Sequence, residues 1–227
     1  MTALVTLKDV SMWFATESNR AYAVFGGINF SIGAGERVAV IGRNGSGKST
    51  LLRVMARIFA PSAGSVEWAP GVSVSMLSLG LGFRPDLTGR DNALLSCMLL
   101  GLSRREAKAS VKHIEAFCEI GAFFDEPVYT YSAGMRARLG FGSALMNRSQ
   151  VILIDETLSV GDTFFRERAR DALSEKLTED RAVVLVSHGE KQVRSLCERA
   201  VLLDRGELIS MGSADKVLAE YASRNDG

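Results

Sequence analysis

The sequence predicts an α/β fold, in which a mainly parallel sheet is covered by helices, an N-terminal part is antiparallel, and a helical subdomain is inserted. The runs 38–41, 151–154 and 182–186 are short, unbroken and apolar, as parallel strands are when both of their faces are buried. Helical patterns separate these runs, which is the order that parallel strands need for their crossovers. Between residues 88 and 148 the apolar period becomes helical, which indicates the insertion.

The first third of the chain is expected to contain strands and one helix. Apolar residues alternate near the N-terminus, and a turn at 33–35 precedes the apolar run at 38–41. Helix-forming residues follow until Pro61, which cannot continue a helix. The expected elements are strands at 4–10, 27–32 and 38–41, a helix at 48–59 and a strand at 72–77.

The helical insertion begins with recognisable helix signals. Ser103 and Glu106 have the spacing of a capping box, and apolar residues follow at helical spacing until Gly121. After Arg148 strands and helices alternate again, with helices near 164–177, after Gly189 and from Ser213. The chain is therefore interpreted as one domain, with residues 1–78 and 149–227 as its core and residues 79–148 as its inserted helical subdomain.

Composition excludes several classes of protein. Lys and Arg number 27 against 26 for Asp and Glu, so a formal net charge of +1 gives no long-range attraction to nucleic acid or acidic lipid. The three cysteines have neither disulfide-framework nor zinc-site spacing, which fits a reducing cytosol. The balanced charge means that no nucleic-acid partner is expected. No run of about 18 apolar residues occurs, so no direct insertion into the bilayer is expected.

A glycine-rich motif stands between an apolar strand and a helix. Residues 42–49 read GRNGSGKS and satisfy the pattern GxxxxGK[ST]. Such glycines let backbone N–H groups close around phosphate oxygens, and the helix N-terminus adds its positive dipole end. Lys48 offers a charge to the outer phosphates, and the Ser49 hydroxyl offers a ligand to Mg²⁺. An ordinary glycine-rich turn is the alternative. The predicted nucleotide-binding residues are Gly42, Asn44, Gly45, Ser46, Gly47, Lys48, Ser49 and Thr50.

A second candidate site follows the strand 151–154, which ends in Asp155 and Glu156. Parallel sheets place ligand sites at the carboxyl ends of their strands. Asp155 is then expected on the Mg²⁺ side, and Glu156 is expected to orient or deprotonate the attacking water. The alternative is that the two acids cap a surface helix, although the buried strand before them aims both at one place.

Ser132 and Gly134 lie at the start of a predicted helix that runs to about Met146. Free backbone N–H groups and a hydroxyl at a positive helix end make a second anion site. Taken alone, this pattern is also that of any helix with an N-capping serine.

The ordered set of motifs resembles the ATP-binding subunits of ABC transporters along essentially the whole chain. Ser132 and Gly134 match the family's signature despite an unusual wording, and Asp162 in the sequence SVGD matches its D-loop. His188 matches the switch histidine, and Phe14 matches the aromatic residue that stacks on adenine. Without the resemblance, His188 would be an ordinary strand-end histidine and Phe14 a core residue.

One family feature has no counterpart. The family usually carries a glutamine between the part that contains the glycine-rich phosphate loop, residues 42–49 here, and the helical subdomain. The only glutamines in this sequence are Gln150 and Gln192. No residue is assigned to its role.

The resemblance implies a function as well as a fold. It implies an ATPase with Mg²⁺ as cofactor, working as a homodimer with ATP at the interface, where Ser132 and Gly134 of one copy face the phosphate loop of the other. It also implies a separate transmembrane permease and a place at the cytoplasmic face of the membrane. The wordings LTGRDN at 87–92, YSAGMRARL at 131–139 and SVGD at 159–162 are similar to the branch that exports capsular polysaccharide, O-antigen or teichoic acid.

Two other function classes are alternatives to an exporter ATPase. A soluble ABC protein of translation or DNA repair usually has tandem cassettes or a coiled-coil insertion, and the chain has neither. A P-loop kinase or a nucleotide-binding scaffold would have no use for Ser132, Glu156 and His188 together.

Overall fold

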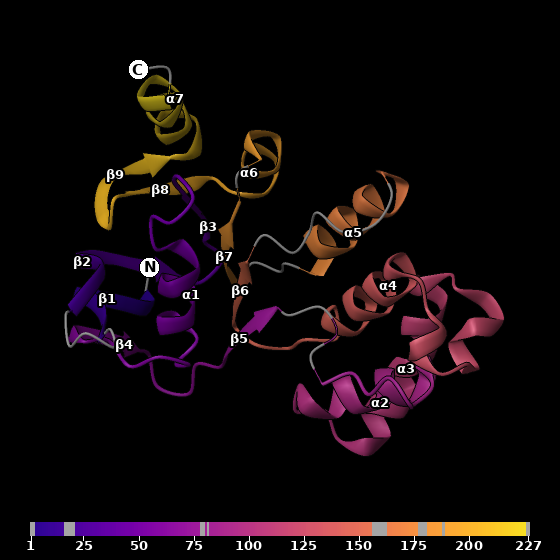
Figure 1. Ribbon diagram of the computed structural model, residues 1–227. Helices are drawn as coiled ribbons and strands as arrows, with labels where there is room; N and C mark the ends of the chain where they lie inside the picture. The colour runs from indigo at the N-terminus through magenta and orange to yellow at the C-terminus, as the bar shows by residue number, and fades with distance from the viewer. Residues whose placement is uncertain are drawn as a thin grey trace. The chain divides into compact units, whose positions relative to one another are not determined.

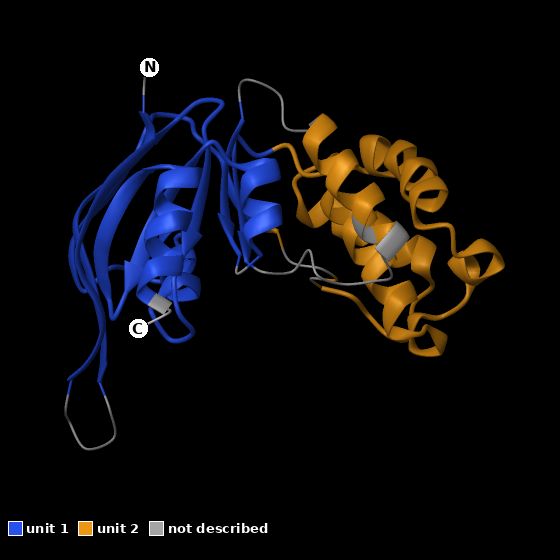
Figure 2. Ribbon diagram, turned by 90° about the horizontal axis from the view of Figure 1, so that it is seen from above, with its two compact units in different colours: residues 1–76, 149–156, 177–227 blue, residues 77–148, 157–176 orange. Residues whose placement is uncertain are grey.

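The computed structural model describes residues 3–15, 21–77, 80, 82–155, 163–176, 181–187 and 189–225, and labels its helices and strands as in Figure 1. Contacts between Cα atoms divide the chain into two compact units (Figure 2). Unit 1 contains residues 1–76, 149–156 and 177–227, and unit 2 contains residues 77–148 and 157–176.

Unit 1 is built on a six-stranded sheet with the order β5-β6-β7-β3-β8-β9. Strands β6, β7, β3 and β8 run parallel, and β9 pairs antiparallel with β8. The bounds are β3 Arg37–Ile41, β5 Val74–Leu77, β6 Val151–Asp155, β7 Ala182–Val186, β8 Arg199–Asp204 and β9 Glu207–Ser213. The predicted parallel strands at 38–41, 151–154 and 182–186 are thus confirmed, and every residue of β7 is buried.

A second sheet in unit 1 is antiparallel, as expected for the N-terminal part. Its order is β2-β1-β4, with β1 Ala3–Ala15, β2 Ala21–Gly33 and β4 Ala63–Trp68. Strands β1 and β2 are longer than the alternating segments that predicted them. Strand β4 was not predicted, because its AGSVEW sequence carries only two large apolar side chains and starts with small residues that are typical of turns.

The helices of unit 1 are α1 Lys48–Met55, α6 Glu190–Leu196 and α7 Ala214–Asn225. Helix α1 ends four residues before the predicted Phe59. The cause is local, because Arg57 adopts a left-handed conformation with φ of 60° and the N–H groups of Ile58 and Phe59 both bond to the carbonyl of Arg53. Leu51, Leu52 and Met55 of α1 join the core between the sheets.

Unit 2 is helical, as the sequence predicts for the insertion. Its elements are α2 Gly89–Leu99, α3 Arg104–Cys118, the 3₁₀ turns η1 Gly121–Asp125 and η2 Val128–Thr130, α4 Ala133–Ala144 and α5 Thr163–Lys176. The capping box of Ser103 and Glu106 is present at the start of α3. Phe165 of α5 packs edge-on against Phe117 and Phe141, with ring centroids 5.6 and 6.0 Å away. A segment beyond β6 therefore completes the core of this unit.

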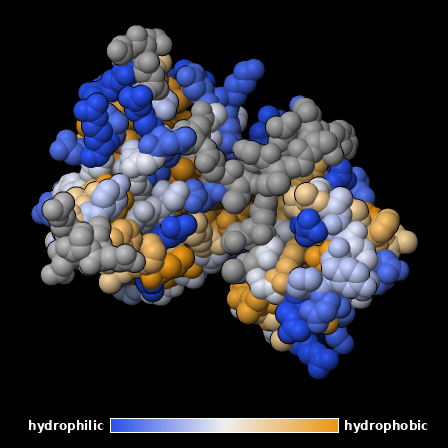
Figure 3. Space-filling model, in the orientation of Figure 1, coloured by the Kyte–Doolittle hydropathy of each residue, from blue (hydrophilic) through white to orange (hydrophobic). Residues whose placement is uncertain are grey.

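The surface carries no sign of a membrane-spanning element. Within the ranges given above, no helix combines the length and the apolar character that crossing a bilayer requires. On the face that Figure 3 shows, apolar and charged side chains are interspersed over both units.

The buried face of α3 can be tested with a pair of substitutions. Ile114 is fully buried, so Ile114→Ala is expected to lower the free energy of unfolding by about 2 to 5 kcal/mol, because it removes packing and leaves a cavity. Lys112→Ala, at an exposed position of the same helix, should change it by less than about 0.5 kcal/mol. Urea unfolding measures both values, and equal effects would contradict the assignment of the buried face.

Candidate functional site

The loop between β3 and α1 takes a shape that only glycine permits at two of its positions. Gly42 has φ of 152°, and a Cβ atom there would lie 1.9 Å from the carbonyl oxygen of Leu203. Gly47 has φ of 100°, and a Cβ atom there would lie 3.2 Å from Cγ1 of Val24. The loop is therefore held close to β8 on one side and to β2 on the other.

The start of α1 has unpaired polar groups. Gly47 occupies the N-cap position, so no side chain caps the first turn of the helix. The hydroxyl of Ser46 is buried and has no hydrogen-bond partner among the described residues. Leaving such a hydroxyl unpaired costs about 1 to 3 kcal/mol, so a ligand that supplies the missing bond would be stabilised here. A phosphate group, which accepts hydrogen bonds, fits this position.

Lys48 brings a buried charge to the same loop. The residue is 6% exposed, and its Nζ donates to the carbonyl oxygens of Gly42 and Arg43, both at 2.8 Å. These bonds hold the ammonium group inside the loop that surrounds it. A cation kept at this place in a poorly solvated environment attracts an anion more strongly than one in water.

Ser49 and Asp155 meet although 106 residues separate them in the sequence. The hydroxyl of Ser49, in the first turn of α1, donates to Oδ1 of Asp155 at the end of β6, at 3.1 Å. Mg²⁺ takes oxygen ligands and usually binds one or two carboxylates together with substrate phosphates and water. The pair therefore fits Mg²⁺ beside a bound phosphate. Among the described residues there is no cluster of three or more metal-binding side chains, so a metal held by protein groups alone is not indicated there.

A pocket of ≈ 330 Å³ opens beside this loop. It joins the loop to the predicted aromatic residue Phe14, which is 38% exposed and packs edge-on against Phe59 at 5.7 Å. Phe14 is thus accessible rather than a core residue. The lining consists of Phe14, Tyr22 and Val24 from β1 and β2, Asn44, Gly45 and Gly47 from the loop, Lys48, Ser49 and Thr50 from α1, and Val186 from β7.

Ser132 and Gly134 lie in unit 2, at the start of α4. Ser132 is the N-cap residue, and its hydroxyl accepts a hydrogen bond from the N–H group of Met135 at 3.2 Å. Both residues keep the helix N-terminus that the sequence predicts, and Ser132 is exposed.

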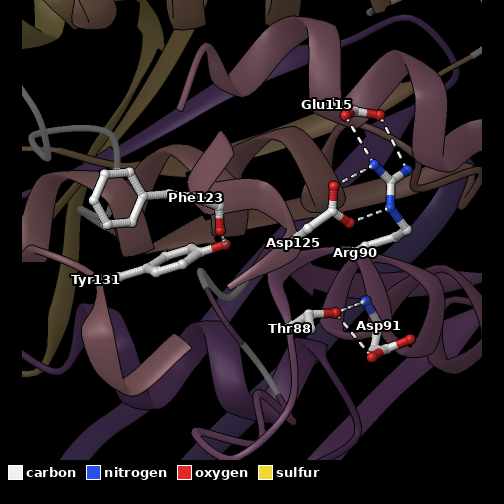
Figure 4. A network of polar contacts seen from close by, with 7 residues as sticks. All are labelled: Thr88, Arg90, Asp91, Glu115, Phe123, Asp125 and Tyr131. Carbon is white, nitrogen blue, oxygen red and sulfur yellow. Dashed lines mark hydrogen bonds and ion pairs between the residues drawn. The ribbon is translucent and has the colours of Figure 1, made fainter. Parts of the chain in front are cut away.

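A network of polar contacts supports the segment before Ser132 (Figure 4). Tyr131 is 3% exposed, and its hydroxyl donates to the carbonyl oxygen of Phe123 at 2.6 Å. Burial raises the pKa of this phenol to about 12, so it stays protonated and keeps the bond at neutral pH. Arg90 of α2 binds Asp125 and Glu115, and the hydrogen bond from Arg90 lowers the pKa of Asp125. The turn η1, which contains Phe123 and Asp125, thus connects Tyr131 to α2 and α3.

Sequence reasoning missed two of these contributions. It did not single out Tyr22 as part of the pocket or Tyr131 as an anchor. Tyr22 is followed by Ala23, Val24 and Phe25, and this apolar run gave no signal for a pocket-lining residue. Glu156, Asp162 and His188 were predicted as functional residues and lie outside the described residues.

The chain is similar to known proteins both in sequence and in fold. A family model described as "ABC transporter" matches residues 25–159. An O-antigen export system ATP-binding protein from Klebsiella pneumoniae is 38% identical over 208 residues, which are 92% of this chain and 84% of that protein. A teichoic acids export ATP-binding protein from Shouchella clausii is 33% identical over 218 residues, or 95% of this chain and 60% of that protein. A dimeric ATP-binding cassette, solved with ADP and phosphate, is similar in fold with a TM-score of 0.77 and 23% identity, over 92% of this chain and 98% of that one.

The close approach of the loop to β8 predicts different outcomes for two glycine substitutions. Gly42→Ala places a methyl group 1.9 Å from the carbonyl of Leu203, so the free energy of unfolding should fall by on the order of 3 kcal/mol. Gly45→Ala has nothing within 4 Å of the added carbon and meets only its left-handed backbone, which costs about 1 to 2 kcal/mol. Urea unfolding of the two variants measures the difference. A loss for Gly45→Ala as large as that for Gly42→Ala would contradict the contact with β8.

Proposed function

This chain belongs to the ABC transporter family, and from that premise we propose that it binds and hydrolyses Mg·ATP as the nucleotide-binding subunit of a cell-surface polysaccharide exporter. The observation that carries the proposal is the phosphate loop, with its buried lysine, its unpaired Ser46 hydroxyl and the Ser49–Asp155 hydrogen bond beside one pocket. The names of relatives that export O-antigen and teichoic acids support the substrate class, which is capsular polysaccharide, O-antigen or teichoic acid.

Different residues of the site bind different parts of Mg·ATP. Backbone N–H groups from Gly42 to Thr50 and the hydroxyl of Ser46 hydrogen-bond the phosphate oxygens, and Asn44, Gly45 and Gly47 line the pocket around them. Lys48 is drawn toward the outer phosphates. Ser49 and Asp155 hold Mg²⁺, which, when bound, neutralises charge that develops on the phosphates. Phe14 contacts the adenine ring by stacking.

Hydrolysis is assigned to two residues that follow the ends of β6 and β7. Glu156 comes directly after Asp155 in the sequence, and it orients the water and accepts its proton. His188 comes two residues after the end of β7 and contacts the γ-phosphate. The phosphate loop and both strand ends belong to one parallel sheet, whose carboxyl edge is where ligands bind.

The second half of the site comes from a second copy of the chain. The exposed N-terminus of α4, with Ser132 and Gly134, caps the γ-phosphate that the other copy holds, and Asp162 contributes to the contact between the copies. Two equivalent sites follow from a two-fold axis. The likeness to a dimeric cassette supports this arrangement. ATP then joins the two copies, and its hydrolysis removes the charge that held them together.

Transport requires a further protein. The names of the relatives, which are ATP-binding proteins of export systems, support a separate transmembrane permease that carries the polymer, with this chain at the cytoplasmic face of the membrane. We propose that the surface of the inserted helical subdomain, residues 79–148, is the part that contacts the permease.

The role of Glu156 can be tested by removing its charge. Glu156→Gln is expected to keep Mg·ATP binding and to slow turnover by on the order of 10² or more, because the amide cannot accept the proton of the water. ATP should then accumulate in a stable dimer, visible by size-exclusion chromatography. Glu167→Gln, at an exposed position of α5, serves as the control and should hydrolyse ATP at the wild-type rate. Undiminished hydrolysis by Glu156→Gln would contradict the assigned role.

A bulky residue at the start of α4 tests whether the site is shared. Ser132→Arg should abolish hydrolysis, because its side chain blocks the approach of the phosphate held by the second copy. The monomer's affinity for ATP, measured by calorimetry at low protein concentration, should stay within about 2-fold, which is less than 0.5 kcal/mol. Ser223→Arg, on the exposed side of α7, should affect neither quantity. If Ser132→Arg destroys the affinity together with the activity, the shared-site arrangement is wrong.

A further inference from the structure

Two aromatic side chains lie next to each other near the end of β1 and the start of β2. Phe14 of β1 and Tyr22 of β2 are register partners in the antiparallel pair. Directly opposite residues of such a pair point to the same face, with their Cβ atoms about 5 Å apart. Both side chains line the pocket beside the phosphate loop. The two rings therefore form one apolar platform on one wall of that pocket.

The two rings lie close to the phosphate loop, because Tyr22 and a residue that contacts the loop belong to the same strand. Val24, two residues beyond Tyr22 on β2, also lines the pocket and lies against Gly47, whose added Cβ would be 3.2 Å from Val24 Cγ1. Two strand residues span at most about 7 Å, so Tyr22 lies within that distance along β2 of the residue that contacts the loop. A nucleotide has the same layout, because its ribose separates the base from the phosphates.

The two rings differ in their surroundings. Phe14 is 38% exposed, and its ring rests edge-on against Phe59 with an interplanar angle of 79°. Tyr22 is 61% exposed, and within the described residues its ring has no aromatic contact and its hydroxyl no hydrogen bond. Leaving a large ring open to water next to a pocket has no benefit for folding, but it leaves a π-face available to a ligand.

We infer that Tyr22 is a second base-stacking residue of the nucleotide site, and that the purine base packs against Tyr22 as well as against Phe14. The inference rests on the proposed function, since it assigns part of the same site. Phe59 holds Phe14 in place, whereas Tyr22 adds a ring whose position the β1–β2 pairing determines. The side chains that the two strands contribute to the pocket are two rings and a valine. Because stacking uses a π-face that every base has, Tyr22 should not distinguish adenine from guanine.

Tyr22→Ala measures the contribution of the ring. With the full chain and isothermal calorimetry, we expect this variant to bind Mg·ATP on the order of 10-fold more weakly than the wild type. Mg·GTP should lose affinity by the same factor. Tyr22→Phe, which keeps the ring and removes the hydroxyl, should bind within about 2-fold of the wild type, which is less than 0.5 kcal/mol. Sodium tripolyphosphate, which has no base, should bind Tyr22→Ala and the wild type equally.

Trp13 supplies a matched control on the neighbouring position. It is an exposed aromatic residue of β1, 43% accessible, pairs with Ala23, and does not line the pocket. Trp13→Ala should therefore leave Mg·ATP affinity unchanged. Circular dichroism and the melting temperature of each variant show whether the fold is kept, which is expected because both side chains are exposed.

The outcomes separate this inference from the proposed function. If the wild type binds neither Mg·ATP nor tripolyphosphate, the proposed function fails and this inference fails with it. If the wild type binds Mg·ATP and Tyr22→Ala binds it equally well, only the role of Tyr22 is overturned. A loss that extends to tripolyphosphate, or one that Tyr22→Phe reproduces in full, would also overturn base stacking, because neither change acts through the ring face.

Discussion

The close approach of the phosphate loop to β8 and β2 is the constraint on which the rest of the site depends. Gly42 packs against the carbonyl of Leu203, and Gly47 packs against Val24, so the loop is held between these two strands. The helix end stays uncapped, and the Ser46 hydroxyl stays buried without a partner among the described residues. Unsatisfied hydrogen-bonding groups are therefore concentrated at one point, and the triphosphate that we propose as the ligand would satisfy them.

In unit 2, hydrogen bonds and ion pairs hold the segment that leads to the N-terminus of α4. The buried hydroxyl of Tyr131 binds the carbonyl of Phe123, and Arg90 joins the same turn to α2 and α3 through Asp125 and Glu115. The residue before the Ser132 N-cap is thus bonded to η1, which Arg90 in turn links to α2 and α3. In the proposed dimer this helix end meets a phosphate held by the other copy, and such rigidity would lower the entropy cost of that contact.

The sequence predicted the parallel strands and the phosphate loop well, because both depend on local patterns. Unbroken apolar runs identify β3, β6 and β7, and the motif at 42–49 carries its own structural requirements. Contacts between distant segments left no such pattern. The packing of Phe165 against Phe117 and Phe141, the hydrogen bond of Tyr131 and the pairing of Phe14 with Tyr22 all join residues that are distant in the sequence or whose pairing the local pattern does not specify. Strand β4 was missed because its pairing with β1, rather than its own propensity, makes it a strand.

In the proposed arrangement one copy holds the nucleotide and a second copy completes the catalytic site. The most direct test is the rate of ATP hydrolysis per copy, measured at saturating Mg·ATP over a wide range of protein concentration. This specific rate is expected to rise in proportion to protein concentration while the chain is mostly monomeric, and to reach a plateau once dimers predominate. A specific rate that stays constant down to concentrations where only monomers remain would contradict the shared site.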